Sequence, residues 1–389
     1  MISRWSRAQL SDGGWVRRMF MEGLRLRAEH GDDAVVDLSL GQPLEADEPI
    51  AEAFRAAAGD RFHGRFGYMP NLGYMEVRER AALDVGFPGV DASCVAMTSG
   101  AAAAITVAIR TFVDPGDEVV GIAPFFPEFR LYCETASARF VPIPTQADLR
   151  LDLGAISAAL SPRTAAVLLN SPCNPSGHVL DEDELRGLAG MLQRHSERHG
   201  RRVLLIVDEV YRRMAYAPHR RLDPLNFYEH SVLARSFSKD LGIAGERIGY
   251  LVLHPSLALP ETHLGLAQAM RALGFVNAPA TAQRALLHLQ SWDINLQPYQ
   301  ERRDVAFDAA RAAGLDAAEP QGGIYLWFRS PWDDTLAFID ELAKRRVLLT
   351  PGVAFGDPSR VRLCFSAPRA KLAAAFDAVT ELTGDAVSA

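Results

Sequence analysis

The sequence has very little lysine. Of its 41 lysine and arginine residues, three are lysines: Lys239, Lys344 and Lys371. Arginine serves wherever this chain needs only a permanent positive charge, since the guanidinium group is always protonated in proteins. The lysine in RSFSKDLGIAGERIGY (235–250) therefore indicates a role that requires an amine.

The chain also lacks long apolar runs and an excess of basic residues. No stretch approaches the ~18 apolar residues of a membrane-spanning helix, and residues 1–15 lack the apolar core of a signal peptide. The net charge of -7 argues against a nucleic-acid-binding surface. Short arginine-rich pieces such as YRRM (211–214) and HGRR (199–202) are interpreted as solvated faces. We expect a soluble cytoplasmic protein without nucleic-acid or membrane partners.

Cysteine is scarce and widely spaced. There is no CxxC pair, so the pattern suits neither a disulfide framework nor a zinc site. We expect reduced, buried thiols and no metal site. The four cysteines are Cys94, Cys133, Cys173 and Cys364.

Short apolar runs alternate with helical patterns through the middle of the 389-residue chain. This alternation predicts an α/β domain around a mostly parallel sheet. The predicted strands cover 117–123, 165–170, 203–208, 231–236 and 248–253, and one predicted helix covers 181–200.

The last hundred residues have a different pattern. A long helical stretch at about 293–313 leads into GGIYLWF (322–328), a helix, two further apolar runs and a terminal helix. This predicts a smaller α+β unit with its own sheet. The expected division is an N-terminal segment, 1–45, that packs on the small domain, a large domain, 46–285, and a small C-terminal domain, 286–389.

Polar residues follow the predicted strands at the points where these strands end. Asp208 ends one strand, Asn174 follows another in a turn-forming context, and Lys239 follows a third. Ligands of open α/β sheets bind at the carboxyl ends of the strands. Each residue alone has a simpler interpretation, because a strand-end Asp is often a helix cap and an Asn-Pro pair is often just a turn.

Taken together, these residues suit one ligand. A lysine near hydroxyl groups and Arg247 can form an imine while its neighbours hold a phosphate. Asp208 can neutralise a protonated ring nitrogen, and Asn174 and Tyr211 can hydrogen-bond a ring oxygen. An aldehyde, a phosphate, a basic ring nitrogen and a phenolic oxygen describe pyridoxal 5'-phosphate.

The segment SFSKDLGIAGERIG resembles the lysine signature of the class I/II aminotransferases, which are fold type I pyridoxal-phosphate enzymes. The resemblance extends from DLSLGQP (37–43) through GYMPNLGY, TSGAAAAI, NSPCNPSG and DEVY to VRLCFS (361–366). It implies a large domain with a mostly parallel sheet flanked by helices and a smaller α+β domain. It also implies an aminotransferase that moves an amino group from an L-amino acid to a 2-oxo acid.

The resemblance assigns the central chemistry to three residues. Lys239 would carry the cofactor as an aldimine and, once displaced by substrate, would move the proton between Cα and the C4′ carbon of the cofactor. Asp208 would keep the ring nitrogen protonated, so that the ring accepts electrons. Tyr211, with Asn174, would hold the ring oxygen.

The resemblance also implies the remaining contacts of the cofactor. Arg247, with its planar fork, and the hydroxyl groups of Ser236 and Ser238 would bind the phosphate. The ring would stack on Phe126, although Phe125 next to it leaves the register open. Backbone N–H groups at the start of a helix would complete the phosphate site, at Gly100, Ala101 and Ala102.

Three further residues would complete the site by the same resemblance. Tyr68 would reach the phosphate of a neighbouring subunit, which implies a homodimer with shared active sites. Arg362 would grip the α-carboxylate of the substrate, and Gly41 would let the backbone approach the same group.

The substrate side chain and the reaction outcome stay open. Arg271 is near the position from which relatives bind a second carboxylate, but Tyr325 and Trp327 also suit an apolar or aromatic side chain. Lyase, replacement or cyclising chemistry on an amino acid is the alternative to transamination, because all of these begin with a carbanion at Cα. A transcriptional regulator with an aminotransferase-like sensor domain is a further alternative.

Overall fold

The computed structural model describes residues 1–11, 14–62 and 65–387. A seven-stranded sheet with the order β2-β8-β7-β6-β5-β3-β4 is its largest element. All neighbours from β7 to β4 pair in parallel, whereas β8 is antiparallel to both β7 and β2. Six of these strands therefore run in one direction and β8 runs against them. The strands are β2 (Val95–Thr98), β3 (Glu118–Ala123), β4 (Arg139–Pro144), β5 (Thr164–Asn170), β6 (Leu204–Asp208), β7 (Ser231–Ser236) and β8 (Gly249–Leu253).

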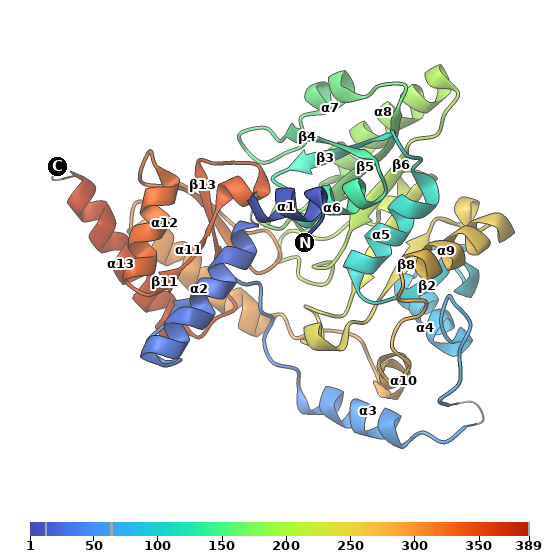
Figure 1. Ribbon diagram of the computed structural model, residues 1–389, viewed down its shortest axis with the longest axis horizontal. Coiled ribbons are helices and arrows are strands. Elements are labelled where there is room, and N and C mark those ends of the chain that lie inside the picture. Colours follow the sequence, from blue (N-terminus) through green and yellow to red (C-terminus); the bar gives the residue numbers. More distant parts are fainter. Residues whose placement is uncertain (12–13, 63–64, 388–389) are drawn as a thin grey trace.

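Helices cover both faces of this sheet (Figure 1), and its central strands are buried on both sides. In β6, Leu204 and Ile206 pack in one core with α5, α6 and α9, while Leu205 and Val207 pack in another with α3, α4, α7, α8 and α10. Such apolar runs are typical of parallel strands between two helical layers. The helices are α3 (Glu48–Gly59), α4 (Met75–Val85), α5 (Ala101–Phe112), α6 (Glu128–Thr135), α7 (Leu153–Ala159), α8 (Glu182–His199), α9 (Pro260–Ala272) and α10 (Ala280–His288).

A second, antiparallel sheet with the order β12-β13-β10-β9 lies in the C-terminal part of the chain. Its apolar side packs on helices α11, α12 and α13 in a separate core. The elements are β9 (Ala317–Ala318), β10 (Tyr325–Arg329), β12 (Thr350–Pro351), β13 (Arg360–Cys364), α11 (Gln297–Ala312), α12 (Thr335–Lys344) and α13 (Arg369–Val387). The predicted combination of a large parallel sheet with a smaller α+β part is confirmed.

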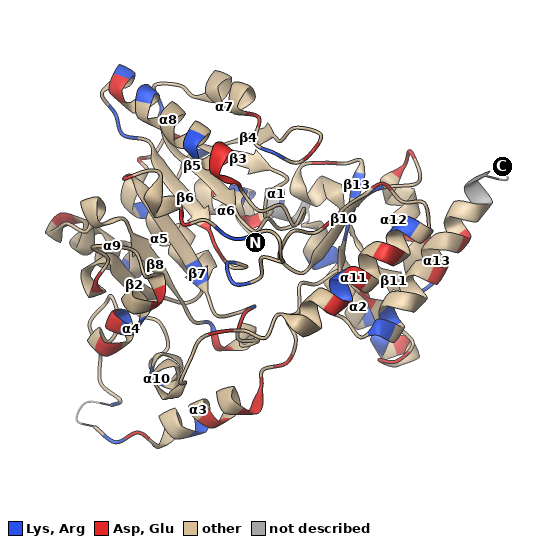
Figure 2. Ribbon diagram, turned by 180° about the vertical axis from the view of Figure 1, so that it is seen from behind, with Lys and Arg blue, Asp and Glu red and all other residues tan. Residues whose placement is uncertain are grey.

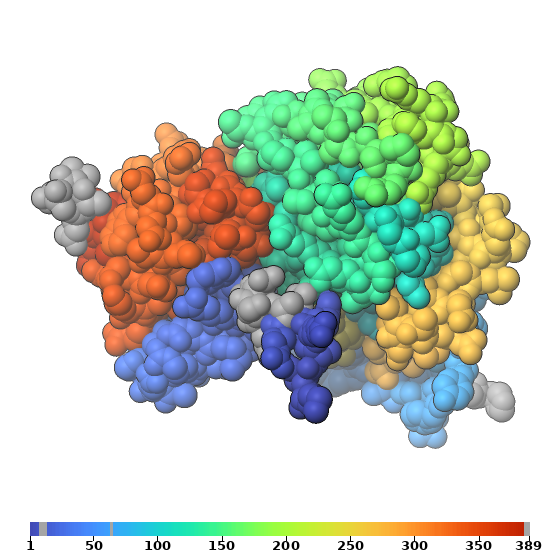
Figure 3. All heavy atoms as spheres, turned by 45° about the horizontal axis from the view of Figure 1, so that its top comes forward, coloured from blue at the N-terminus to red at the C-terminus, as the bar shows by residue number. Residues whose placement is uncertain are grey.

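The N-terminal segment contacts both parts. Strand β1 (Val36–Asp37) pairs in parallel with β11 (Val347–Leu348), and Met19 of α2 (Trp15–His30) joins the core of the second sheet. In α1 (Arg4–Ser11), however, Trp5 Nε1 donates a hydrogen bond at 3.2 Å to the carboxylate of Glu134 in α6. The dark blue α1 accordingly lies near α6 in Figure 1 and beside the green part of the molecule in Figure 3, while α2 lies against the orange C-terminal part.

The change from one core to the other occurs after α10. Helix α10 packs on α3, and Trp292 still belongs to the core of the large sheet. Tyr299 of α11 belongs to the core of the second sheet. The domain boundary near residue 285 stays a prediction. Among the described residues, short 3-10 helices connect the elements: η1 (Ala92–Cys94), η2 (Pro224–Asn226), η3 (Ala244–Glu246), η4 (Pro255–Leu257) and η5 (Gly352–Phe355).

The surface carries charges of both signs. Acidic and basic residues are interspersed on α2, α11, α12 and α13 (Figure 2). Within the described residues, no helix is both long enough and apolar enough to cross a membrane. All four cysteines are free thiols, and Cys173 is the least buried of them.

Candidate active site

A cavity of about 260 Å³ opens where the strands of the large sheet end. Because β8 runs against the other strands, the residues that precede β8 lie at the same edge as those that follow β5, β6 and β7. Most residues predicted for the site line this cavity: Gly41, Ala101, Ala102, Phe126, Asn174, Asp208, Tyr211, Ser236, Ser238, Lys239, Arg247 and Arg362.

Lys239 reaches the cavity from the turn after β7. Its Nζ donates a hydrogen bond to the backbone oxygen of Gly41. Burial of the ammonium group, together with the positive charges of Arg362 and Arg247, lowers the pKa of Lys239 to about 8. An appreciable fraction of the amine is therefore unprotonated near neutral pH, as a nucleophile or a general base requires.

Asp208 is the last residue of β6, and its carboxyl group is buried at the cavity. Oδ1 accepts a hydrogen bond at 3.2 Å from the backbone N–H of Val210. Burial raises the pKa of Asp208 to about 7, since no arginine or lysine pairs with it in the part of the chain that the structure describes. A carboxylate in this environment would be stabilised by a cationic group of a ligand.

Groups that suit a phosphate lie together beside the cavity. Gly100 precedes the first turn of α5 with a φ of 89°, and a Cβ atom there would lie 2.7 Å from Nη2 of Arg247. Arg247 Nη1 donates to Ser238 Oγ at 3.4 Å, and Ser236 Oγ donates to Ser238 Oγ at 2.8 Å. Arg247 itself has a φ of 51°, which is uncommon for a residue other than glycine and occurs preferentially at functional sites. Hydrogen-bond donors of three kinds therefore lie close together beside the cavity: hydroxyl groups, a guanidinium group and the backbone N–H groups at the start of α5.

Tyr211 and Asn174 line the same cavity from the loops that follow the neighbouring parallel strands β6 and β5. Tyr211 Oη donates to Tyr325 Oη at 3.1 Å, and burial raises the pKa of the Tyr211 phenol, so that the phenol remains a donor. Asn174 Oδ1 accepts from Arg362 Nη1 at 3.0 Å. With its oxygen engaged in this way, Asn174 offers its Nδ2 donors to a ligand oxygen.

Arg362 is almost fully buried between two aromatic rings. Its Cζ lies 4.3 Å from the ring centre of Tyr325 and 4.6 Å from that of Phe355, and Nη2 donates to the backbone oxygen of Ser39 at 2.5 Å. Nε has no hydrogen-bond partner among the described residues. A Cβ atom at Gly41 would lie 1.8 Å from Tyr325 Oη, so this position requires glycine. The guanidinium group of Arg362 is therefore held rigidly, and the backbone of Gly41 packs closely against the neighbouring Tyr325.

The structure separates the two adjacent phenylalanines. Phe126 lines the cavity, whereas Phe125 is buried against Phe140 with ring centres 5.0 Å apart. Of these two phenylalanines, Phe126 is therefore the one that can contact a ligand in this cavity.

Three residues considered in the sequence lie away from this cavity. Tyr68 is fully exposed, and Arg271 at the end of α9 is also exposed. Trp327 is fully buried and packs edge-on against Phe355. Within the described part of this chain, Arg247 and Arg362 are the arginines that line the cavity, and Trp327 does not line it.

Several lining residues carried no signal in the sequence. They are apolar or aromatic residues on helices and loops whose position depends on tertiary packing: Val16, Ile105, Tyr132, Val210 and Ala244.

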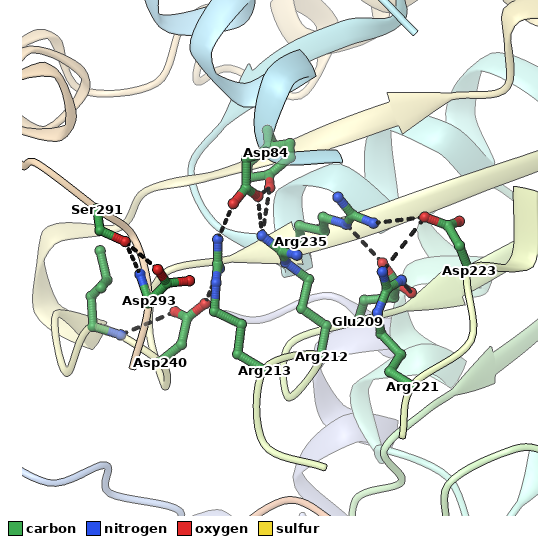
Figure 4. Close-up of polar contacts among 12 residues, drawn as sticks. Asp84, Glu209, Arg212, Arg213, Arg221, Asp223, Arg235, Asp240, Ser291 and Asp293 are labelled. Atoms are coloured by element: carbon green, nitrogen blue, oxygen red, sulfur yellow. Dashed lines mark hydrogen bonds and ion pairs between the residues drawn. The ribbon is translucent and has the colours of Figure 1, made fainter. Parts of the chain in front are cut away.

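A network of buried ion pairs lies beneath the same strand ends (Figure 4). Asp84 of α4 accepts from Arg212 and Arg213, and Arg213 Nη1 also pairs with Asp240 at 2.5 Å. Glu209 accepts from Arg235 and Arg221, each at 2.7 Å. Asp223 lies 3.5 and 3.7 Å from the same two arginines. The network thus contains four acidic residues and four arginines, and their formal charges cancel.

This network corrects one interpretation of the sequence. The arginines of YRRM (211–214) were expected on a solvated face, but the side chains of Arg212 and Arg213 are only 8% and 10% exposed. The sequence alone could not show this, because their main partner, Asp84, lies more than 120 residues earlier in the chain.

Known proteins are similar to this chain over most of its length. Residues 33–379 match the family model for aminotransferase class I and II. The probable aspartate aminotransferase of Methanocaldococcus jannaschii is 28% identical, over 85% of this chain and 88% of its own. The arginine–pyruvate transaminase of Pseudomonas aeruginosa is also 28% identical, over 85% and 84%. An amino transferase structure from Eubacterium rectale superposes with a TM-score of 0.91 at 28% identity, covering 99% of both chains.

The chain therefore belongs to the class I and II aminotransferase family. The predicted family, the predicted fold and the prediction of an enzyme of the aminotransferase type are confirmed.

Proposed function

We propose that this protein is a pyridoxal-phosphate-dependent aminotransferase that moves an amino group from an L-amino acid to a 2-oxo acid. One observation carries the proposal: the amine of Lys239, with its lowered pKa, and the unpaired carboxyl group of Asp208 line one cavity at the carboxyl ends of neighbouring strands.

The side chains at the cavity fit this cofactor. Arg247, Ser236, Ser238 and the start of α5 form a set of donors for a phosphate, and the missing Cβ of Gly100 leaves space there. Phe126 offers a flat apolar surface for a ring, and a ring nitrogen that carries a proton would meet Asp208. When bound, pyridoxal phosphate supplies an aldehyde that takes up the amino group and a ring that withdraws electrons from the bonds at Cα.

Lys239 is proposed to move the proton at the substrate's Cα. A buried amine with a pKa of about 8 can take this proton and would deliver it to the C4′ carbon of the cofactor, without a large free-energy penalty in either step. Asp208 is proposed to hold a proton at the ring nitrogen, because an ion pair there would relieve the desolvation that raises its pKa. Tyr211 and Asn174 are proposed to donate to the ring oxygen.

Arg362 is proposed to bind the α-carboxylate. Its guanidinium group is held by Asn174 and Ser39 and lies over aromatic rings, so it costs little conformational entropy to present it to a carboxylate. Gly41 lines the same cavity and is proposed to bring its backbone close to the carboxylate. Fixing this group orients the Cα–H bond toward Lys239, which is how binding energy lowers the barrier of the proton transfer.

Tyr68 and the assembly belong to the same proposal. Tyr68 and Phe66, which are 101% and 92% exposed, lie on a loop away from the cavity of their own chain. Large exposed aromatic side chains mark interaction surfaces. We expect this loop to meet a second copy of the chain in a homodimer, where Tyr68 would reach the phosphate of the partner.

A screen of L-amino acids with pyruvate and 2-oxoglutarate as acceptors tests the activity. Mass spectrometry should detect a 2-oxo acid from the donor and a new amino acid from the acceptor, in equal amounts. Products that form without an acceptor, or that have altered side chains, would contradict transamination and support lyase or replacement chemistry. The relatives named for aspartate and for arginine are both 28% identical to this chain, so the screen must include both acidic and basic donors.

A further inference from the structure

Glu128 has a buried carboxylate oxygen that the proposed reaction does not use. It is the first residue of α6 and follows Phe126, which lines the cavity, by two positions. Its Oε2 is buried and finds no hydrogen-bond partner in residues 1–11, 14–62 and 65–387. A buried carboxylate oxygen without a partner is costly, so it indicates either strain or a missing ligand.

Glu128 lies directly behind the residues that line the cavity, one helical turn before Tyr132 on the same face of α6. It interacts electrostatically with Arg362, Tyr132 and Tyr325, and all three line the cavity. Burial raises the pKa of Glu128, and its own backbone N–H and the charge of Arg362 only partly oppose this. The group therefore lacks a cation that would stabilise its charged form.

Arg362 does not supply this cation directly. Its two Nη atoms are engaged with Asn174 and Ser39, and no ion pair of 4 Å or less joins it to Glu128 among the described side chains. By contrast, the buried acids Glu209, Asp240 and Glu118 each contact an arginine. The difference indicates that the partner of Glu128 comes from outside the chain.

We propose that Glu128 determines substrate specificity by pairing with a cation at the end of a linear amino-acid side chain, a guanidinium or ammonium group, while Arg362 holds the α-carboxylate. This inference rests on the proposed aminotransferase function. The apolar side chains of Val16 and Ile105 in the cavity lining suit the methylene groups of such a substrate. A dicarboxylate would instead place its second negative charge near Glu128, which disfavours acidic substrates.

Binding of analogues that cannot react tests the pairing without turnover. Isothermal titration of the holoenzyme with 5-guanidinopentanoate and with its neutral counterpart 5-ureidopentanoate compares a cation with an uncharged group of the same shape. We expect the cation to bind about 10- to 100-fold more tightly, as for a charge-assisted hydrogen bond. In Glu128→Gln this preference should fall to about threefold or less, while binding of the ureido compound changes little.

Two further variants make the result specific. Glu128→Asp keeps the charge but withdraws it by one methylene group, so it should keep part of the preference. Glu182→Gln, at an exposed position on α8, should keep all of it. An equal loss of affinity for both compounds in Glu128→Gln, or no preference in the wild type, would overturn the assignment.

A second readout separates this inference from the proposed function. The ratio of kcat/KM for L-arginine over L-citrulline should fall in Glu128→Gln by the same factor as the binding preference. Preferential binding of the guanidinium analogue without any 2-oxo acid product would refute the aminotransferase proposal and leave the role of Glu128 intact. Formation of 2-oxo acids from citrulline and arginine at equal kcat/KM would support the aminotransferase proposal and refute the role of Glu128.

Discussion

Two sets of charged residues occupy the same strand ends and differ in their partners. Asp208 and Lys239 face the cavity and form no ion pair within the described residues, whereas the next residue of each, Glu209 and Asp240, forms ion pairs with arginines beneath it. Asp208, Glu209 and Asp240 are buried, and Lys239 is half-buried. The first set is available to a ligand, and the second set is satisfied by the protein itself.

The two adjacent acids show what the partners change. Burial raises the pKa of Asp208 to about 7. Burial acts in the same direction on Glu209, but the charges of Arg221 and Arg235 outweigh it and lower the pKa of Glu209 to about 2. Asp208 can therefore gain or lose its proton near neutral pH when a ligand binds, whereas its neighbour Glu209 is permanently ionised.

Replacing a paired acid should have the largest effect on stability. Glu209→Gln leaves Arg235 and Arg221 without a carboxylate in the interior, which should lower the free energy of unfolding by about 3–5 kcal/mol. Urea unfolding measures this change. The control Glu182→Gln removes an exposed pair and should stay within about 0.5 kcal/mol of the wild type. A loss below about 1 kcal/mol in Glu209→Gln would show that the network is not structural.

Replacing the unpaired acid, Asp208, should change how the free energy of unfolding depends on pH. The folded pKa of Asp208 is raised above its ordinary value of 3.8, so its contribution to stability is fully present below about pH 4 and is lost as the pH rises through about 7. Between pH 5 and pH 8, the cofactor-free wild type should therefore lose about 2–3 kcal/mol more than Asp208→Asn, in the free energy of unfolding. If the free energy of unfolding changes with pH by the same amount in both proteins, the carboxyl group of Asp208 is not in the buried, unpaired environment described here.

The sequence predicts the part of the site that depends on local order. Each strand that supplies Asn174, Asp208 or Lys239 is an apolar run that ends at a polar residue, and this pattern survives in any parallel sheet. The short strand β2 and the edge strand β4 were not predicted. Strand β4 contains Pro142 and Pro144, which lower the strand signal and are tolerated at an edge.

The residues that the sequence did not reveal depend on distant packing. Glu128 reads as an ordinary acidic residue at the start of a helix, and only the folded chain brings it near Arg362, more than 230 residues later. Arg212 and Arg213 read as surface residues until Asp84 packs on them. Pairing between remote charges has no periodic pattern, so it becomes visible only in three dimensions.

The central claim is that Lys239 is the amine of this site, and the scarcity of lysine makes it directly measurable. Borohydride reduction of the purified holoenzyme, followed by proteolysis and mass spectrometry, should place the mass of the reduced cofactor on the peptide that contains Lys239. Lys344 is exposed and pairs with Glu341, and Lys371 donates to the backbone oxygen of Val35, so both should remain unmodified. Recovery of the cofactor on either of them, with Lys239 unmodified, would contradict the claim.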